Sequence, residues 1–106
     1  MDHNYIEERP WGSFEILLNE TYCKVKRIIV KPGHKLSYQY HEHRSEHWSI
    51  VQGAGTVTLD DNEHIFEEGT VVEIPVKTKH RVENSSHKNL IIIETQTGTY
   101  FGEDDI

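Results

Sequence analysis

The chain contains one cysteine, Cys23, among its 106 residues. A single cysteine cannot form a disulfide within the chain, which excludes a disulfide-stapled fold and suits a reducing compartment. We therefore expect a cytoplasmic protein. We interpret Cys23 as a small packing residue rather than a nucleophile, because free cysteine is among the most buried residue types.

Basic residues and long apolar runs are also scarce. The 11 Lys and Arg residues are outnumbered by 18 Asp and Glu, which gives a formal net charge of -7. A nucleic-acid face needs a basic patch, so we expect no nucleic-acid partner. No apolar run approaches the roughly 18 residues of a membrane span, and the first residues contain no apolar signal core. We expect neither a membrane partner nor a secretory leader.

The sequence does contain many short β-prone segments separated by turns. No stretch of useful length has a helical period, so we expect an all-β sandwich or barrel in one domain, 1–106. The triplet Asp60-Asp61-Asn62 is a good hairpin signal. The predicted strands are 14–18, 22–30, 36–43, 48–51, 56–59, 64–66, 70–74, 80–83 and 89–97.

The predicted strand 36–43 has an unusually polar face. Alternate side chains leave a strand on the same face, which here groups Ser37, Gln39, His41 and His43. A strand of a small β domain should offer its core an apolar face. Positions where the pattern fails locally are often functional, so this face is a candidate site.

Two stretches are spaced to build one metal site. Gln39 and His41 share a strand face, Glu46 follows a turn and can point back at them, and His80 arrives from a separate strand. Imidazole and carboxylate are the ordinary ligands of divalent transition metals, and an amide oxygen is a weaker one. We expect zinc first, with iron, nickel, manganese or cobalt as alternatives, held by Gln39, His41, Glu46 and His80.

The same spacing is the two-part signature of the cupin family. It places Gln39 where the commonest version has a third histidine. The alternative, a histidine-rich surface hairpin, does not explain the separate second half of the signature. The two halves are Gly33, Gln39, His41, Glu46 and Gly53, then Gly69, Pro75, His80 and Asn84. The resemblance implies a double-stranded β-helix, the cupin jelly roll.

Three segments are more specific. They are RPWGSF at 9–14, QYHEHRSEHW at 39–48 and QTGTYFGEDDI at 96–106. Together they resemble the C-terminal cupin domain of type II phosphomannose isomerases, which in many bacteria follows a mannose-1-phosphate guanylyltransferase. The resemblance implies interconversion of mannose 6-phosphate and fructose 6-phosphate, whereas no glycine-rich phosphate loop for guanylyl transfer is present. Glu42 stands where the family commonly has another histidine, and Tyr38 and Tyr40 replace smaller residues.

An aldose–ketose isomerisation needs a group that shuttles a proton. The candidates are Glu46, His43 and Glu94, of which Glu94 shares a strand face with Leu90, Ile92 and Gln96. A carboxyl group in an apolar barrel has a raised pKa, which suits this role.

A small sugar-phosphate substrate also needs cations, and the planar fork of Arg44 or Arg81 matches phosphate oxygens. We choose Arg44 first. Lys26, Ser37 and Tyr100 complete the predicted substrate contacts.

Two other functions use similar residues. One is a non-catalytic sugar-phosphate-binding cupin, and the other is an Fe(II) dioxygenase, whose metal is held by two histidines and one carboxylate. We also expect a homodimer, because a small jelly roll exposes sheet edges and an apolar outer face. That face would include Tyr38 and Tyr40 or the Ile91 and Ile93 side of the last strand.

Overall fold

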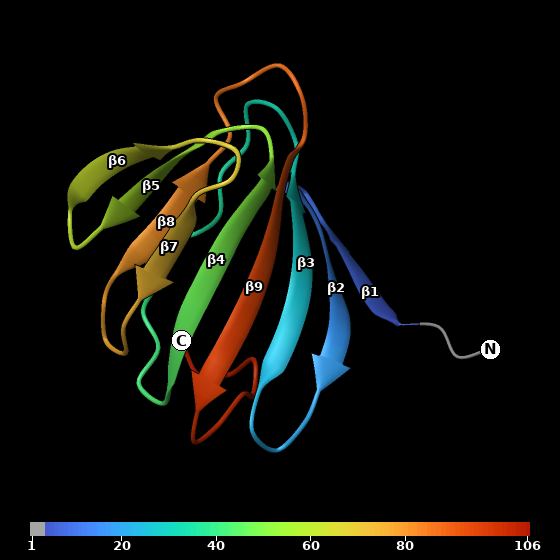
Figure 1. Cartoon of the computed structure of the whole chain (residues 1–106), viewed down its shortest axis with the longest axis vertical. Helices are drawn as coiled ribbons and strands as arrows, with labels where there is room; N and C mark the ends of the chain where they lie inside the picture. Colours follow the sequence, from blue (N-terminus) through green and yellow to red (C-terminus); the bar gives the residue numbers. More distant parts are fainter. Residues whose placement is uncertain (1–3) are drawn as a thin grey trace.

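The computed structural model describes residues 4–106, which fold into two antiparallel sheets and their connections (Figure 1). The larger sheet has the order β1 (Tyr5–Arg9), β2 (Gly12–Asn19), β3 (Lys24–Val30), β9 (Leu90–Gly98), β4 (Arg44–Gln52) and β7 (Val71–Ile74). The smaller sheet has the order β6 (Asn62–Phe66), β5 (Gly55–Leu59) and β8 (His80–Glu83). The all-β prediction is confirmed. The described residues include no helix that could cross a membrane.

The hydrophobic core lies between the two sheets. Along β3, β4 and β9, buried residues alternate with less buried ones, as expected when one face of a sheet packs on a core. Val57 and Val82 contribute from the smaller sheet. The buried apolar residues are Ile28, Val30, Trp48, Ile50, Val57, Val72, Ile74, Val82, Leu90 and Ile92.

Strand register divides the inner face of the larger sheet into an apolar part and a polar part. In the apolar part, Ile28 pairs with Ile92, which pairs with Ile50. Two residues further along β9, Glu94 lies between Lys26 and Trp48, and after two more Gln96 lies between Lys24 and Glu46. All the polar members of these two rows are buried. The polar part therefore occupies positions that would otherwise belong to the core.

Two local predictions are confirmed by the strand bounds. The predicted segment 80–83 coincides with β8, and β5 and β6 form the expected hairpin. Asp60 and Asp61 connect them with φ values of 45° and 70°. Positive φ at both central residues is what a two-residue hairpin turn of the type I′ class requires.

The prediction of a strand at 36–43 is wrong. Residues 31–43 instead connect β3 to β4 and touch β8 at two isolated bridges, Lys35 with Glu83 and Gln39 with His80. The backbone N–H of Gln39 donates to the His80 carbonyl at 3.1 Å, and the N–H of His80 donates back at 2.8 Å. The alternation of polar residues correctly predicts an extended backbone. It does not indicate how many backbone hydrogen bonds that segment forms with a neighbouring strand.

Two other differences from the sequence prediction affect the candidate site. β1 was not predicted, because YIEER carries too few apolar residues to show an alternating pattern. β4 begins at Arg44 rather than at residue 48, so Glu46 is a strand residue on the inner face of the larger sheet. This position fixes Glu46 in the polar part of that face.

Candidate metal centre

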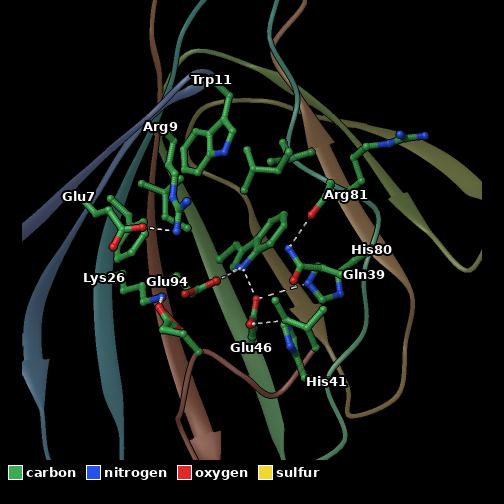
Figure 2. Close-up of a pocket in the computed structure, with 18 of the residues that line it drawn as sticks. Glu7, Arg9, Trp11, Lys26, Gln39, His41, Glu46, His80, Arg81 and Glu94 are labelled. Carbon is green, nitrogen blue, oxygen red and sulfur yellow. Dashed lines mark hydrogen bonds and ion pairs between the residues drawn. The ribbon is translucent and has the colours of Figure 1, made fainter.

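Three side chains from three parts of the fold converge between the sheets. His41 ends the extended connection, Glu46 lies on β4, and His80 begins β8. Each is no more than 4% exposed. One donor atom from each lies within 4.8 Å of the others. His41 Nε2 is 3.1 Å from Glu46 Oε2, and His80 Nε2 is 3.7 Å from Glu46 Oε1 (Figure 2).

The outer ring nitrogens of both histidines face backbone carbonyls. His41 Nδ1 lies 2.5 Å from the Asp105 carbonyl oxygen, and His80 Nδ1 lies 3.0 Å from that of Thr78. A carbonyl oxygen can only accept, so each Nδ1 carries a proton. Each Nε2 is thereby turned toward Glu46. A metal-binding histidine is oriented in this way, with its second N–H held by a carbonyl. The donor set therefore fits a divalent transition metal.

Glu46 is held by two further donors. Arg44 Nε donates to Oε2 at 2.9 Å, and the Trp48 indole N–H donates to Oε1 at 3.0 Å. Arg44 itself is 6% exposed and shares the inner face of β4 with Glu46. Its guanidinium therefore belongs to a buried cluster. The cluster consists of His41, Arg44, Glu46, Trp48, His80 and Glu94.

Two pKa directions suit metal binding. Burial raises the pKa of Glu46, but hydrogen bonds with His41 and Glu94 and the charges of His80 and Arg44 outweigh it and hold the pKa well below its usual value. Burial lowers the pKa of His80, although the charge of Glu46 opposes this. An ionised carboxylate and a neutral imidazole are the forms that ligate a metal.

Glu94 is the second carboxyl group of the cluster. The Trp48 indole N–H donates to its Oε1 at 3.0 Å, and Gln96 Nε2 donates to its Oε2 at 2.8 Å. Burial and the negative charge of Glu46 raise the pKa of Glu94 to about 8. Near neutral pH, Glu94 is therefore mostly protonated beside an ionised Glu46. The sequence prediction that Glu94 faces inward is consistent with this position.

A cavity of about 460 Å³ is lined by the three residues of the candidate metal centre. Ser37 and Gln39 line it near the cluster, and Gln39 Nε2 donates to Ser37 Oγ at 3.3 Å. Figure 2 shows Gln39 beside His80. Ligation of a metal by the Gln39 amide oxygen stays a prediction. Apolar side chains also line the cavity: Trp11, Phe14, Ile28, Leu36 and Val82.

The predicted phosphate-binding cations have partners. Lys26 Nζ forms an ion pair with Glu103 and lies 4.4 Å from the centre of the Phe14 ring. The Arg81 guanidinium lies 5.4 Å from the centre of the Tyr38 ring. Figure 2 shows the Arg81 side chain leading away from the cluster. Lys26 pairs across the strands with Glu94 and therefore lies beside the buried carboxyl groups.

His43 and Tyr100 lie elsewhere. The two exposed rings meet edge to face with their centres 6.1 Å apart. Among the described residues, neither belongs to the wall of the cavity that contains the metal centre. The reason is the turn after His41, which directs Glu42 and His43 outward before Arg44 returns to the inner face. Their placement does not support a proton-shuttling role for His43 or a capping role for Tyr100.

Sequence reasoning missed several residues at this site. Arg9 and Glu7 form an ion pair at the cavity wall, where β1 brings them. Arg9 was noticed only as part of RPWGSF, because no strand was expected before residue 14. Glu103 and Asp105 contact the cluster from the C-terminal segment. Their only signal was the resemblance of QTGTYFGEDDI to a family motif.

Comparison with known proteins identifies the family. Residues 2–106 match the family model described as mannose-6-phosphate isomerase C-terminal. The alginate biosynthesis protein AlgA of Pseudomonas syringae pv. tomato is 46% identical over 104 residues, which cover 97% of this chain and 22% of AlgA. A mannose-1-phosphate guanylyltransferase of Klebsiella pneumoniae is 41% identical over 98 residues, 92% of this chain and 21% of that protein. The chain thus spans about a fifth of the length of these curated relatives.

Solved structures confirm the cupin fold. The capsular polysaccharide assembling protein CapF of Staphylococcus aureus matches with a TM-score of 0.82 and 21% identity, over 98% of this chain and 31% of CapF. An RmlC-like cupin of Shewanella frigidimarina matches with a TM-score of 0.81 and 19% identity, over 96% of this chain and 87% of that one. At these identities the likeness concerns the fold alone.

Proposed function

Because the chain belongs to the mannose-6-phosphate isomerase C-terminal family, we propose that it interconverts mannose 6-phosphate and fructose 6-phosphate. The proposal includes a divalent transition metal, zinc first, held by His41, Glu46 and His80. When bound, such a metal supplies Lewis-acid stabilisation of negative charge on the sugar oxygens. The residues of the chain must bind the sugar phosphate and move its proton.

One observation carries this proposal. A buried, protonated carboxyl group, Glu94, lies beside an ionised one, Glu46, and both accept from the indole N–H of Trp48. Two carboxyl groups whose surroundings separate their pKa values are a recurrent arrangement in acid–base catalysis. Both line the cavity that also contains the two histidines. The cluster therefore offers one group for metal ligation and another for proton transfer.

The reaction removes a proton from C2 of the aldose and delivers one to C1, while a hydroxyl hydrogen moves from O2 to O1. A single group that takes and returns the carbon-bound proton can serve both directions. Glu94 suits this task because its pKa of about 8 leaves a fraction ionised near neutral pH. Glu46 is the less suitable group, because Arg44, Trp48 and the histidines already engage its two oxygens.

The phosphate group carries about two negative charges near neutral pH. The acidic chain offers it few cations, and the contacts favour Lys26 and Arg9 over Arg44. Arg44 is occupied by Glu46. The Arg9 side chain is 52% exposed on the cavity wall, and the carboxylate paired with Lys26, that of Glu103, is 47% exposed. An incoming phosphate can replace the exposed carboxylate of Glu103, whereas separating the buried pair of Arg44 and Glu46 is costly.

The test is a coupled isomerase assay on the purified chain. The chain is loaded separately with Zn²⁺, Co²⁺, Mn²⁺, Ni²⁺ and Fe²⁺, and formation of fructose 6-phosphate from mannose 6-phosphate is followed. We expect turnover that disappears in His80→Ala. His47→Ala is the matched control, since His47 is exposed on the outer face of β4 and pairs with Glu73.

Binding and oxygen measurements on the same metal-loaded protein distinguish the rival functions. Sugar-phosphate binding without turnover under any metal would overturn the isomerase proposal and leave a binding protein. Oxygen consumption by the iron-loaded chain would instead indicate a dioxygenase. Both outcomes would keep the metal centre, because the same three ligands serve all three functions.

A further inference from the structure

The C-terminal segment 101–105 lies against the metal centre. Asp105 is 8% exposed. Its two carboxylate oxygens accept the backbone N–H groups of Glu42 and His43, each at 3.0 Å. Its backbone carbonyl oxygen lies 2.5 Å from His41 Nδ1. One residue therefore contacts three consecutive residues of the turn that carries a metal ligand.

The two histidines of the centre are positioned in different ways. His80 belongs to β8, where it pairs with Leu59, and its Nδ1 partner is only two residues away at Thr78. His41 belongs to no strand, and its Nδ1 partner, Asp105, is 64 residues away. The backbone around His41 therefore depends on a distant segment, whereas that around His80 is held by its own strand.

The segment is itself anchored to the larger sheet. The Nζ of Lys24 donates to the Phe101 carbonyl oxygen at 2.9 Å. Glu103 pairs with Lys26 and lies 3.8 Å from Arg44 Nη1. These contacts fix the path of the chain toward Asp105, so that its carbonyl oxygen is presented to His41 in one position.

We propose that Asp105 is a positioning residue of the metal centre, which holds the turn at His41 so that Nδ1 is protonated and Nε2 points at the metal. The carboxylate holds the two N–H groups after His41, and the carbonyl sets the orientation of the ring. The inference rests on the metal centre of the proposed function but not on isomerase activity. Partners of this kind typically affect metal affinity by about tenfold to a hundredfold.

The alternative is that Asp105 only stabilises the fold. Asp104 provides the matched control, because it is the neighbouring residue, carries the same charge, and is exposed with its carboxylate accepting from the Tyr100 hydroxyl. A fold-stabilising role would change the unfolding temperature with and without metal alike. A positioning role changes the affinity for metal while the protein stays folded.

The experiment measures zinc affinity by competition with a chelator, without substrate, in the parent, Asp105→Ala, Asp105→Asn and Asp104→Ala. We expect Asp105→Ala to bind zinc about tenfold or more weakly. Asp105→Asn should lie between it and the parent, because its amide oxygen can still accept one N–H group. Asp104→Ala should stay within twofold of the parent. The cobalt-loaded Asp105→Ala should also show an altered ligand-field spectrum.

Equal zinc affinity in the parent and in a folded Asp105 variant would overturn the inference, as would an equal loss in Asp104→Ala. A measurement on the zinc-loaded parent needs no variant. Nitrogen NMR of its histidines should show His41 with a protonated Nδ1 and zinc on Nε2. Zinc on Nδ1 of His41 would contradict the inference. Because no sugar is present, failure of the isomerase assay leaves these outcomes unaffected.

Discussion

The indole N–H of Trp48 is shared between Glu46 and Glu94, at 3.0 Å from one oxygen of each. Trp48 and Glu94 are paired across β4 and β9, and Glu46 lies two residues before Trp48 on the same face. A single neutral donor thus lies between two buried carboxyl groups. It donates to both groups without adding charge, while Arg44 and the histidines favour the negative charge on Glu46 and burial favours the proton on Glu94.

Trp48→Phe should therefore destabilise the metal-free protein beyond the loss of packing. The substitution keeps an aromatic ring but leaves two buried carboxyl oxygens without this donor, at a cost of about 1–3 kcal/mol for an unsatisfied group. Urea denaturation measures the effect. Trp11→Phe, at another indole that lines the cavity, is the control and should cost less. Equal losses in the two variants would contradict the role given to the Trp48 N–H.

Glu94 should make the stability of the metal-free protein fall as pH rises. Its pKa is about 8 in the folded protein and about 4.3 when unfolded. Between these values the folded state holds the proton more tightly, so rising pH lowers the free energy of unfolding, by at most about 1.4 kcal/mol per pH unit. Glu94→Gln should flatten this slope between pH 5 and 8. An unchanged slope in chelator-treated protein would show that Glu94 is not the group responsible.

Glu103→Gln should tighten the binding of inorganic phosphate several-fold. The substitution removes the carboxylate that now pairs with Lys26, while the cation stays on the cavity wall. Isothermal titration with phosphate measures the change, and Asp104→Asn controls for the loss of one exposed negative charge. Adding Lys26→Met to Glu103→Gln should abolish the gain. If the gain persists in the double variant, phosphate binds elsewhere.

The three residues of the candidate metal centre could be predicted from the sequence because their signal is spacing, which can be read without knowledge of the fold. His41, Glu46 and His80 were found in this way, and Glu94 was found from its alternation with Ile92 on one strand face. The contact of Asp105 with His41 could not be found, since it joins residues 64 apart through a backbone carbonyl. No side-chain pattern records which carbonyl faces a ring. The same limit explains the wrong strand at 36–43.

We still predict a closed two-fold dimer. Ile91 and Ile93 lie on the outer face of β9, where they are half-buried, and Ile91 pairs with Ile29 on β3. An apolar patch in the middle of an outer sheet face favours association with a second copy. Light scattering at micromolar concentration should give twice the mass of the chain, and Ile91→Lys should halve it. Ile65→Lys, at an exposed residue of β6, is the control. A monomeric parent would overturn the prediction.

Arg44 should prove to be a partner of the metal ligands rather than a phosphate-binding residue. Its Nε donates to Glu46 Oε2 at 2.9 Å, and its Nη2 lies 3.3 Å from His41 Nε2. In the metal-free protein, the Arg44 guanidinium is thus the charged partner of the Glu46 carboxylate. Arg44→Met should therefore leave a buried carboxylate without its charged partner, at a cost of about 3–5 kcal/mol.

Zinc should offset much of that cost, because a bound cation replaces the lost charge beside Glu46. The increase in unfolding temperature on adding zinc should thus be larger in Arg44→Met than in the parent. Arg81→Met is the control, since the Arg81 guanidinium lies over Tyr38 and away from the cluster. Differential scanning calorimetry with and without zinc measures both values. If Arg44→Met unfolds at the parent temperature without metal but loses sugar-phosphate binding, the phosphate role predicted from the sequence is the correct one.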